Sequence, residues 1–133
     1  MLQPKPGPAL LLNLKFYWKP MNRKLILYIA TSVDGYIAGP DDDLGFLSTV
    51  DKPGEDYGYG AFIDTVDTVI LGRRTYDWVM KHVNTFPHAD KESYIISRTP
   101  RAAIGNINFY TGDLTALVRR LKKKDGKNIL CDG

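Results

Sequence analysis

The sequence has almost no cysteine, no long hydrophobic run and little excess of charge, and each absence excludes a class of protein. Its 133 residues include one cysteine, Cys131, so no intrachain disulfide and no cysteine-based metal cluster can form. No apolar run is long enough to span a membrane. The formal net charge of +3 is too small for a nucleic-acid-binding protein, in which a concentrated basic stripe is expected. We therefore expect a cytoplasmic protein without nucleic-acid or membrane partners.

The composition that remains is typical of one folded domain. Hydrophobic residues make up 44% of the chain and charged residues 25%, and 133 residues suffice for a single core. The first twenty residues differ, because four of the eight prolines lie there. We predict a flexible extension over residues 1–20 and a domain over residues 21–133. An arm that binds a partner is the alternative for the extension, supported only by its aromatic residues at 16–18.

Strand and helix signals alternate from Lys24 onward, which predicts an α/β fold. Such alternation is typical of three α/β/α layers around a mostly parallel sheet. Cys131 lies in an apolar run, where a buried thiol is the expected state and a reactive thiol the alternative. The expected strands are 25–30, 67–71, 93–97, 107–110 and 128–131, and the first should be buried. The expected helices are 55–65, 73–83 and one that Asp113 caps and Gly126 stops.

The most informative stretch is the turn that follows the second expected strand. An apolar β-branched run ends at Gly72, and apolar residues recur at helical spacing from 76 to 83. Arg73, Arg74 and Thr75 therefore fall in the first turn of a helix, where backbone N–H groups are free and a partial positive charge develops. Two guanidinium groups at such a turn predict an anion site, most naturally for phosphate.

Four segments in this order resemble the dihydrofolate reductase-like superfamily. They are Ala30–Ala38, Leu71–Tyr76, Ile95–Arg98 and Ile129–Gly133. The resemblance covers the chain from about Lys24 to its end. It is closest to the branch named for the C-terminal reductase domain of the riboflavin-biosynthesis deaminase–reductase. It implies the dihydrofolate reductase-like fold and a nicotinamide cofactor, NADPH, across the carboxyl ends of the strands.

The resemblance also implies which residues hold the cofactor. Small and apolar side chains would line the nicotinamide slot, although core packing explains them equally well. The glycine–arginine turn would grip the phosphates, and an arginine at a later strand end would meet the 2′-phosphate unless it is simply solvated. The residues assigned to the cofactor in this way are Ala30, Ile37, Gly72, Arg73, Arg74, Thr75, Ser97, Arg98 and Gly133.

The substrate side is less well marked. The residues assigned to the substrate are Ser32, Asp34, Tyr57 and Tyr59. Asp34 would start a mobile active-site loop, or it belongs to a plain hairpin turn. Reduction by hydride also needs a proton, and Asp56 or Glu55 could supply it. Both carboxylates could equally be charges that stabilise a helix N-terminus. No metal is expected, because the two histidines lack partners at ligand spacing.

The function implied by the resemblance is an NADPH-dependent reductase of a small heterocyclic substrate. The leading specific expectation is a 5-amino-6-(5-phosphoribosylamino)uracil reductase of riboflavin biosynthesis, or a paralogue. A non-catalytic nucleotide-binding or structural protein of the same fold, and a dihydrofolate reductase, are the alternatives. The sequence stops at Gly133, inside a Gly-Gly motif of the family. We therefore expect a domain that is incomplete at its carboxyl end, with a homodimer as one way to cover the exposed surface.

Overall fold

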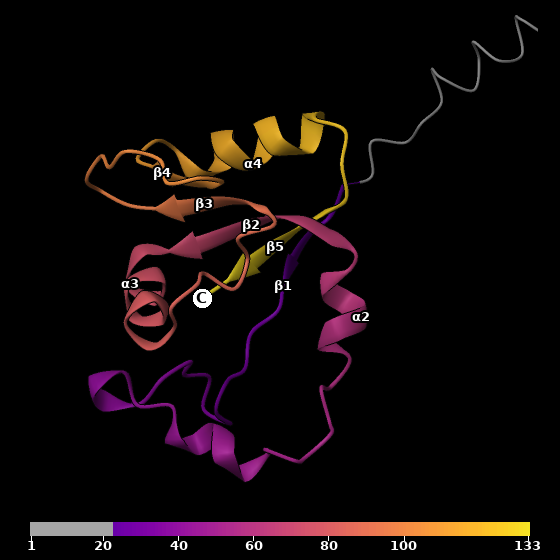
Figure 1. Cartoon of the computed structure of the whole chain (residues 1–133), viewed down its shortest axis with the longest axis vertical. Helices are drawn as coiled ribbons and strands as arrows, with labels where there is room; N and C mark the ends of the chain where they lie inside the picture. The colour runs from indigo at the N-terminus through magenta and orange to yellow at the C-terminus, as the bar shows by residue number, and fades with distance from the viewer. Residues whose placement is uncertain (1–22) are drawn as a thin grey trace, which may run out of the picture.

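The computed structural model describes residues 23–133 as an α/β fold around one five-stranded sheet (Figure 1). The strands are β1 (Leu25–Leu27), β2 (Val66–Gly72), β3 (Glu92–Ile96), β4 (Ile107–Tyr110) and β5 (Asn128–Asp132). Their spatial order is β1-β5-β2-β3-β4, and all four pairings are parallel. The extension predicted for residues 1–20 lies outside the described residues.

Helices cover both faces of the sheet, as predicted. The helices are α2 (Tyr59–Ile63), α3 (Arg73–His82) and α4 (Leu114–Lys123), with short 3₁₀ segments η1 (Pro40–Asp42) and η2 (Gly45–Thr49). Successive residues of β2 point to opposite faces. Ile70 packs against α4 through Leu117, whereas Leu71 packs against Tyr76 of α3 on the other face. The three-layer α/β/α arrangement is thereby confirmed (Figure 1).

The first strand is shorter and more exposed than predicted. β1 ends at Leu27 and pairs only with β5, so it forms an edge of the sheet. Leu27 is 63% exposed. Tyr28 leaves the strand, and its ring stacks on that of Phe62 in α2 with centroids 4.7 Å apart. The prediction of a buried strand over 25–30 is therefore wrong, because an apolar run alone does not reveal that the strand lies at an edge. For the same reason Cys131, opposite Leu27, is half-buried rather than buried.

The helix predicted over 55–65 is also shorter than expected. Tyr57 and Gly58 adopt positive φ angles of 52° and 78°, so the helix begins only at Tyr59. At α4, Asp113 caps the helix as predicted, and its Oδ2 accepts a hydrogen bond from the Ala116 amide at 2.8 Å. The helix ends at Lys123, so Gly126 does not stop it.

Gly126 instead makes room for a buried arginine at the amino ends of the strands. The Arg23 guanidinium donates to the carbonyl oxygens of Lys127 and Leu121 at 2.6 and 2.8 Å. It also donates to Asp67 Oδ1 and Thr68 Oγ1, both at 2.5 Å. A Cβ atom at Gly126 would lie 2.6 Å from Asp67 Oδ2 and 3.0 Å from Arg23 Cζ. These contacts join β2, α4 and the residue before β5 to the segment that leads into β1.

No helix among residues 23–133 is long and apolar enough to cross a membrane.

Candidate functional site

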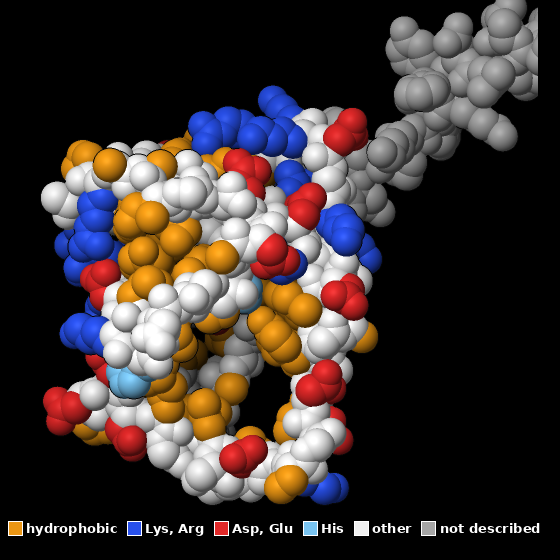
Figure 2. Space-filling view, in the orientation of Figure 1, with side chains coloured by type: hydrophobic (Ala, Val, Ile, Leu, Met, Phe, Trp, Pro, Cys, Tyr) orange, Lys and Arg blue, Asp and Glu red, His pale blue; other side chains and the backbone are white. Residues whose placement is uncertain are grey.

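A cavity of about 1150 Å³ lies beyond the carboxyl ends of β2, β3 and β4. The start of α3 and the segment 37–44, which carries η1, form its other walls. Ligands of open α/β sheets bind in this position. The volume exceeds the upper range of about 1000 Å³ for pockets of drug-sized ligands, so the cavity can accept a dinucleotide. The space-filling view shows a different hollow, bordered by hydrophobic side chains, between the segment that follows β1 and the segment that leads into α2 (Figure 2).

The floor of the cavity is formed where the backbones of β2 and β5 approach each other. The Gly72 amide donates to the Gly133 carbonyl oxygen at 3.1 Å. A Cβ atom at Gly72 would lie only 2.9 Å from this oxygen, so any larger residue would push the strand ends apart. At Gly133 a Cβ atom would meet Thr75 Oγ1 at 3.3 Å and Ile37 Cδ1 at 3.5 Å.

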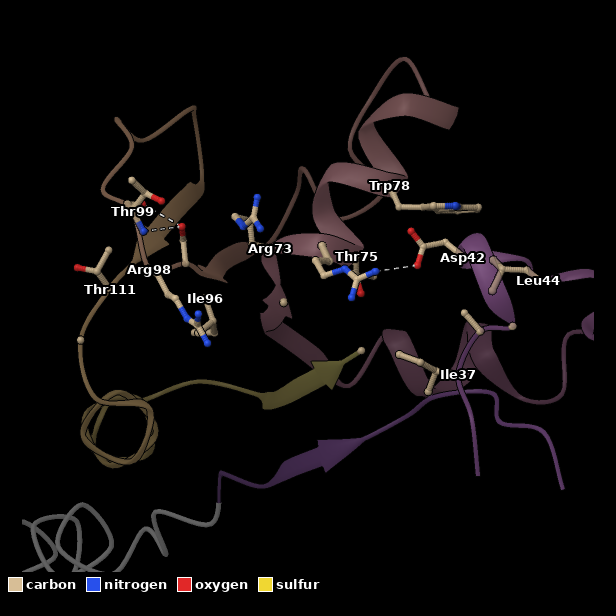
Figure 3. Close-up of a pocket in the computed structure, with 17 residues that line it drawn as sticks. Ile37, Asp42, Leu44, Arg73, Thr75, Trp78, Ile96, Arg98, Thr99 and Thr111 are labelled. Atoms are coloured by element: carbon tan, nitrogen blue, oxygen red, sulfur yellow. Dashed lines mark hydrogen bonds and ion pairs between the residues drawn. The ribbon is translucent and has the colours of Figure 1, made fainter. Parts of the chain in front are cut away.

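The first turn of α3 presents two arginines to the cavity. Gly72 is the N-cap of α3, and no side chain caps this end of the helix. Arg73 Nη1 lies 3.2 Å from Asp77 Oδ2, and Arg74 Nη2 lies 3.2 Å from Asp42 Oδ1 (Figure 3). The Arg74 side chain is 82% exposed. Such exposed pairs are worth about 0–1 kcal/mol, so a bound phosphate could replace the carboxylates at little cost.

The opposite wall comes from the ends of β3 and β4. The Ser97 hydroxyl donates to the Thr99 carbonyl oxygen at 2.9 Å and accepts from the Thr99 amide at 3.1 Å, which forms a local turn. Arg98 follows on the exposed side and has no hydrogen-bond or ion-pair partner within residues 23–133. Thr111, after β4, lies near Arg98 (Figure 3). Arg98 is therefore the cation of this wall that is available to an anion.

The structure gathers nearly all of the predicted cofactor residues in this cavity. Those that line it are Ile37, Gly72, Arg73, Arg74, Thr75, Ser97, Arg98 and Gly133. Ala30 does not line it. The placement agrees with an anion site at the glycine–arginine turn, and the cofactor assignments themselves stay predictions.

The predicted catalytic and substrate residues lie outside the cavity lining. Ser32 and Asp34 form a local turn in which Ser32 Oγ donates to Asp34 Oδ1 at 2.5 Å, as the hairpin alternative expects. Glu55 Oε1 accepts the Tyr57 amide at 2.7 Å. Asp56 accepts the amides of Gly58 and Gly60 at 2.9 and 3.1 Å. These hydrogen bonds lower the pKa of Asp56 below its ordinary value and support the alternative that the two carboxylates stabilise the start of a helix.

Two predicted substrate residues remain, Tyr57 and Tyr59. Tyr57 is exposed, and its hydroxyl donates to the Val50 carbonyl oxygen at 2.5 Å. Tyr59 belongs to an aromatic cluster with Tyr28 and Phe62. Its ring centroid lies 5.6 Å from that of Tyr28. Burial raises its pKa, and the negative charge of Asp132 raises it further. Asp132 is the last residue of β5 and lies close enough to Tyr59 to affect its pKa. The next residue, Gly133, forms the cavity floor.

Several lining residues were not predicted. Trp78 follows Thr75 by three positions and so shares its face of α3, a spacing that the sequence displays. Thr111 and Gly112 directly follow β4, just as Arg73 directly follows β2. They could have been predicted as lining residues, because residues that follow the carboxyl ends of parallel strands meet at the ligand-binding edge of the sheet. Asp42 and Leu44 come from a polar loop whose path back over the strand ends no local pattern reveals.

Within the described residues, no group of three His, Cys, Asp or Glu side chains is arranged to hold a metal ion. The charged side chains that line the cavity are those of Asp42, Arg73, Arg74 and Arg98.

Comparison with known proteins gives two curated relatives and a solved structure. No family model matches the chain. YwjB of Bacillus subtilis (strain 168), an uncharacterized protein, is 40% identical over 114 residues, which are 85% of this chain and 65% of YwjB. YyaP of the same organism, also uncharacterized, is 28% identical over 118 residues, or 80% of this chain and 61% of YyaP.

The solved structure is that of a protein from Shewanella sp. PV-4 named "Putative riboflavin biosynthesis protein". It superposes with a TM-score of 0.71 at 30% identity and covers 83% of this chain and 64% of its own. The chain shares its fold with this protein, which confirms the predicted dihydrofolate reductase-like fold class. It spans slightly less than two thirds of the length of each of these three relatives.

Proposed function

We propose that this chain is an NADPH-dependent reductase of a small heterocyclic substrate. The leading candidate substrate is 5-amino-6-(5-phosphoribosylamino)uracil, or that of a paralogous reaction. The observation that carries the proposal is one cavity with the arginines of α3 on one wall and Arg98 on another. The name of the Shewanella protein supports the riboflavin pathway as the context.

The residues of the cavity fit a phosphorylated dinucleotide. The Gly72–Gly133 contact leaves the strand ends without side chains, so a pyrophosphate can approach the backbone. Arg73 and Arg74 would neutralise its charge at the uncapped end of α3. Arg98 would pair with the 2′-phosphate, which distinguishes NADPH from NADH.

Bound NADPH supplies a hydride, and the chain must then orient the reactants and exclude water. Ile37, Leu44 and Trp78 give the cavity an apolar wall beside the first turn of α3. Such a wall suits a flat ring and keeps water from the hydride. The polar anchors therefore hold the phosphates at one end, and the apolar side chains surround the reacting end.

The variant Arg98→Ala tests the cofactor assignment. We expect the dissociation constant for NADPH to rise roughly tenfold, because one charge-assisted hydrogen bond is lost, and that for NADH to change less than about twofold. Titration calorimetry with both cofactors measures this. Arg119→Ala, an exposed arginine of α4, is the matched control and should leave both constants unchanged.

Two results would contradict the proposal. Equal weakening of NADPH and NADH would remove Arg98 from the 2′-phosphate, and no binding of either cofactor to the folded chain would exclude the reductase. Oxidation of NADPH with the pyrimidine substrate, but not with dihydrofolate, would select the riboflavin-type reaction. Tight NADPH binding without oxidation by either substrate would favour the non-catalytic alternative.

A further inference from the structure

The first strand of the sheet has a free edge. β1 pairs with β5 on one side and has no strand partner on the other side among residues 23–133 (Figure 1). The Lys24 carbonyl oxygen accepts a hydrogen bond from β5 at 2.7 Å, and the Tyr28 amide donates one to β5 at 3.3 Å. Backbone groups of alternate residues point to opposite edges of a strand, so the amides and carbonyl oxygens of Leu25 and Leu27 point to the free edge.

The side chains along this edge are apolar and largely uncovered. Leu25 and Leu27 lie on the face of the sheet where Ile129, the partner of Leu25 in β5, packs against α4. Leu25 is nevertheless 39% exposed and Leu27 63% exposed. A free strand edge with exposed apolar side chains is a site of association, which proteins normally cover.

The chain directly before β1 has the sequence pattern of a strand with one buried face. Apolar side chains occupy every second position from 12 to 18, and these residues are Leu12, Leu14, Phe16 and Trp18. Asn13, Lys15 and Tyr17 occupy the positions between them. Strict alternation over seven residues is typical of a half-buried β-strand. An amphipathic strand pattern therefore precedes the strand whose edge has no partner within residues 23–133.

The connection between the two segments has the length of a hairpin loop. Arg23 is only 8% exposed and is held by four hydrogen bonds, so it fixes the point from which the preceding chain departs. Residues 19–22 form a connection of four residues and include proline and asparagine, which are typical of turns. A loop of this length places Phe16 opposite Leu25 and Leu14 opposite Leu27. In both pairs the backbone groups face each other, as an antiparallel ladder requires.

We propose that residues 12–18 dock on the free edge of β1 as an antiparallel strand, with Phe16 covering Leu25 and Leu14 covering Leu27. Docking satisfies the outward backbone groups of β1 and buries its apolar side chains. A tethered segment is present at a high effective concentration beside this edge, which favours it over a second copy of the chain. The inference is independent of the proposed reductase activity.

Disulfide formation in the full chain tests the pairing and its register. Cys131→Ser first removes the single native thiol. Leu27→Cys is then combined in turn with Leu14→Cys, Asn13→Cys or Lys15→Cys. Opposite residues of an antiparallel pair have Cα atoms about 5.5 Å apart, which suits a disulfide. We expect the combination with Leu14→Cys to form an intrachain disulfide about tenfold faster than the other two, whose side chains point to the opposite face.

Peptide mapping under non-reducing conditions identifies the bond that forms. Equal rates for positions 13, 14 and 15, or faster bonding from 13 or 15, would overturn the inference, because the segment would then lack the stated register. A disulfide between two chains would assign the edge to a second copy and would also overturn it.

Hydrogen exchange of the wild-type chain gives a second readout that needs no cysteine variant. We expect amides of residues 12–18 to exchange about tenfold or more slowly than those of an unstructured peptide of the same sequence. Phe16→Asp should abolish this protection, because it places a charge against Leu25. Asn13→Asp adds the same charge on the opposite face and is the matched control, so protection should remain there. Exchange of the wild-type segment at the rate of the free peptide would refute the docking.

Discussion

Arginine side chains lie in opposite environments at the two ends of the parallel sheet. At the amino ends, the Arg23 side chain is 4% exposed and donates to two carbonyl oxygens, a carboxylate and a hydroxyl. At the carboxyl ends, Arg74 is 82% exposed with one carboxylate partner, and Arg98 has none among the described residues. The same side chain stabilises the fold where its hydrogen bonds are satisfied internally. It is available to a ligand where they are not.

The largest effect should come from a substitution at the amino ends of the strands, where the arginine is paired internally. Arg23→Met leaves Asp67 without its cation and two carbonyl oxygens without a donor, so we expect a loss of about 3 to 5 kcal/mol in the free energy of unfolding. Urea denaturation measures this loss. Arg119→Met, at an exposed arginine, should cost less than about 0.5 kcal/mol. A loss below 1 kcal/mol for Arg23→Met would mean that this end tolerates an unpaired carboxylate, and the contrast would then fail.

An intermediate effect should come from a substitution in the cavity floor at the carboxyl ends of the strands. Gly72→Ala places a methyl group 2.9 Å from the Gly133 carbonyl oxygen, which must move. We expect NADPH affinity to fall roughly tenfold while the chain stays folded, because a shift of the floor misplaces the phosphate site. Cofactor fluorescence gives the affinity, and circular dichroism checks the fold. In the control Gly45→Ala the new methyl group meets only the exposed Asp43 carboxylate, so unchanged binding is expected there. Equal affinity for Gly72→Ala and wild type would show that the floor does not position the cofactor.

The smallest effect concerns how the free energy of unfolding depends on acidic pH through Asp67, the carboxylate partner of Arg23. Burial alone would raise the pKa of Asp67, but hydrogen bonds from the Lys127 amide, Arg23 and Thr68 outweigh it and lower the pKa below 3.8. The stabilisation from this shift is therefore present above about pH 4 and is lost as pH falls through the lowered pKa. Asp67→Asn should abolish that part of the acid dependence, measured by urea denaturation between pH 2 and 6. An acid dependence identical to wild type would assign it to other carboxylates.

The sequence predicted those parts of the molecule that local chemistry determines. The β2–α3 turn follows from an apolar run, a glycine and helical spacing, so Gly72, Arg73, Arg74 and Thr75 were placed correctly. Asp113 caps α4 because capping needs only an amide three residues away. Strand order, in contrast, depends on pairing between distant segments, and the sequence alone did not reveal that β1 is an edge strand.

The difference between local and long-range contacts also explains which residues of the site were predicted and which were missed. Most predicted cofactor residues lie in one cavity because the carboxyl ends of parallel strands meet at one edge of the sheet. Arg23 was missed because its partners lie 44 to 104 residues away along the chain. Asp56 was predicted as a proton donor from a local pattern, but its carboxylate accepts hydrogen bonds from two amides of its own turn and lies outside the cavity lining.

The strand order also determines when the sheet can be assembled. β5 follows the other four strands in the chain and yet lies between β1 and β2. During synthesis on the ribosome, β2, β3 and β4 can pair as they emerge, whereas β1 must wait for β5 and so for roughly a hundred further residues. Docking of β5 therefore brings together β1, the partners of the buried Arg23 and the cavity floor in one step.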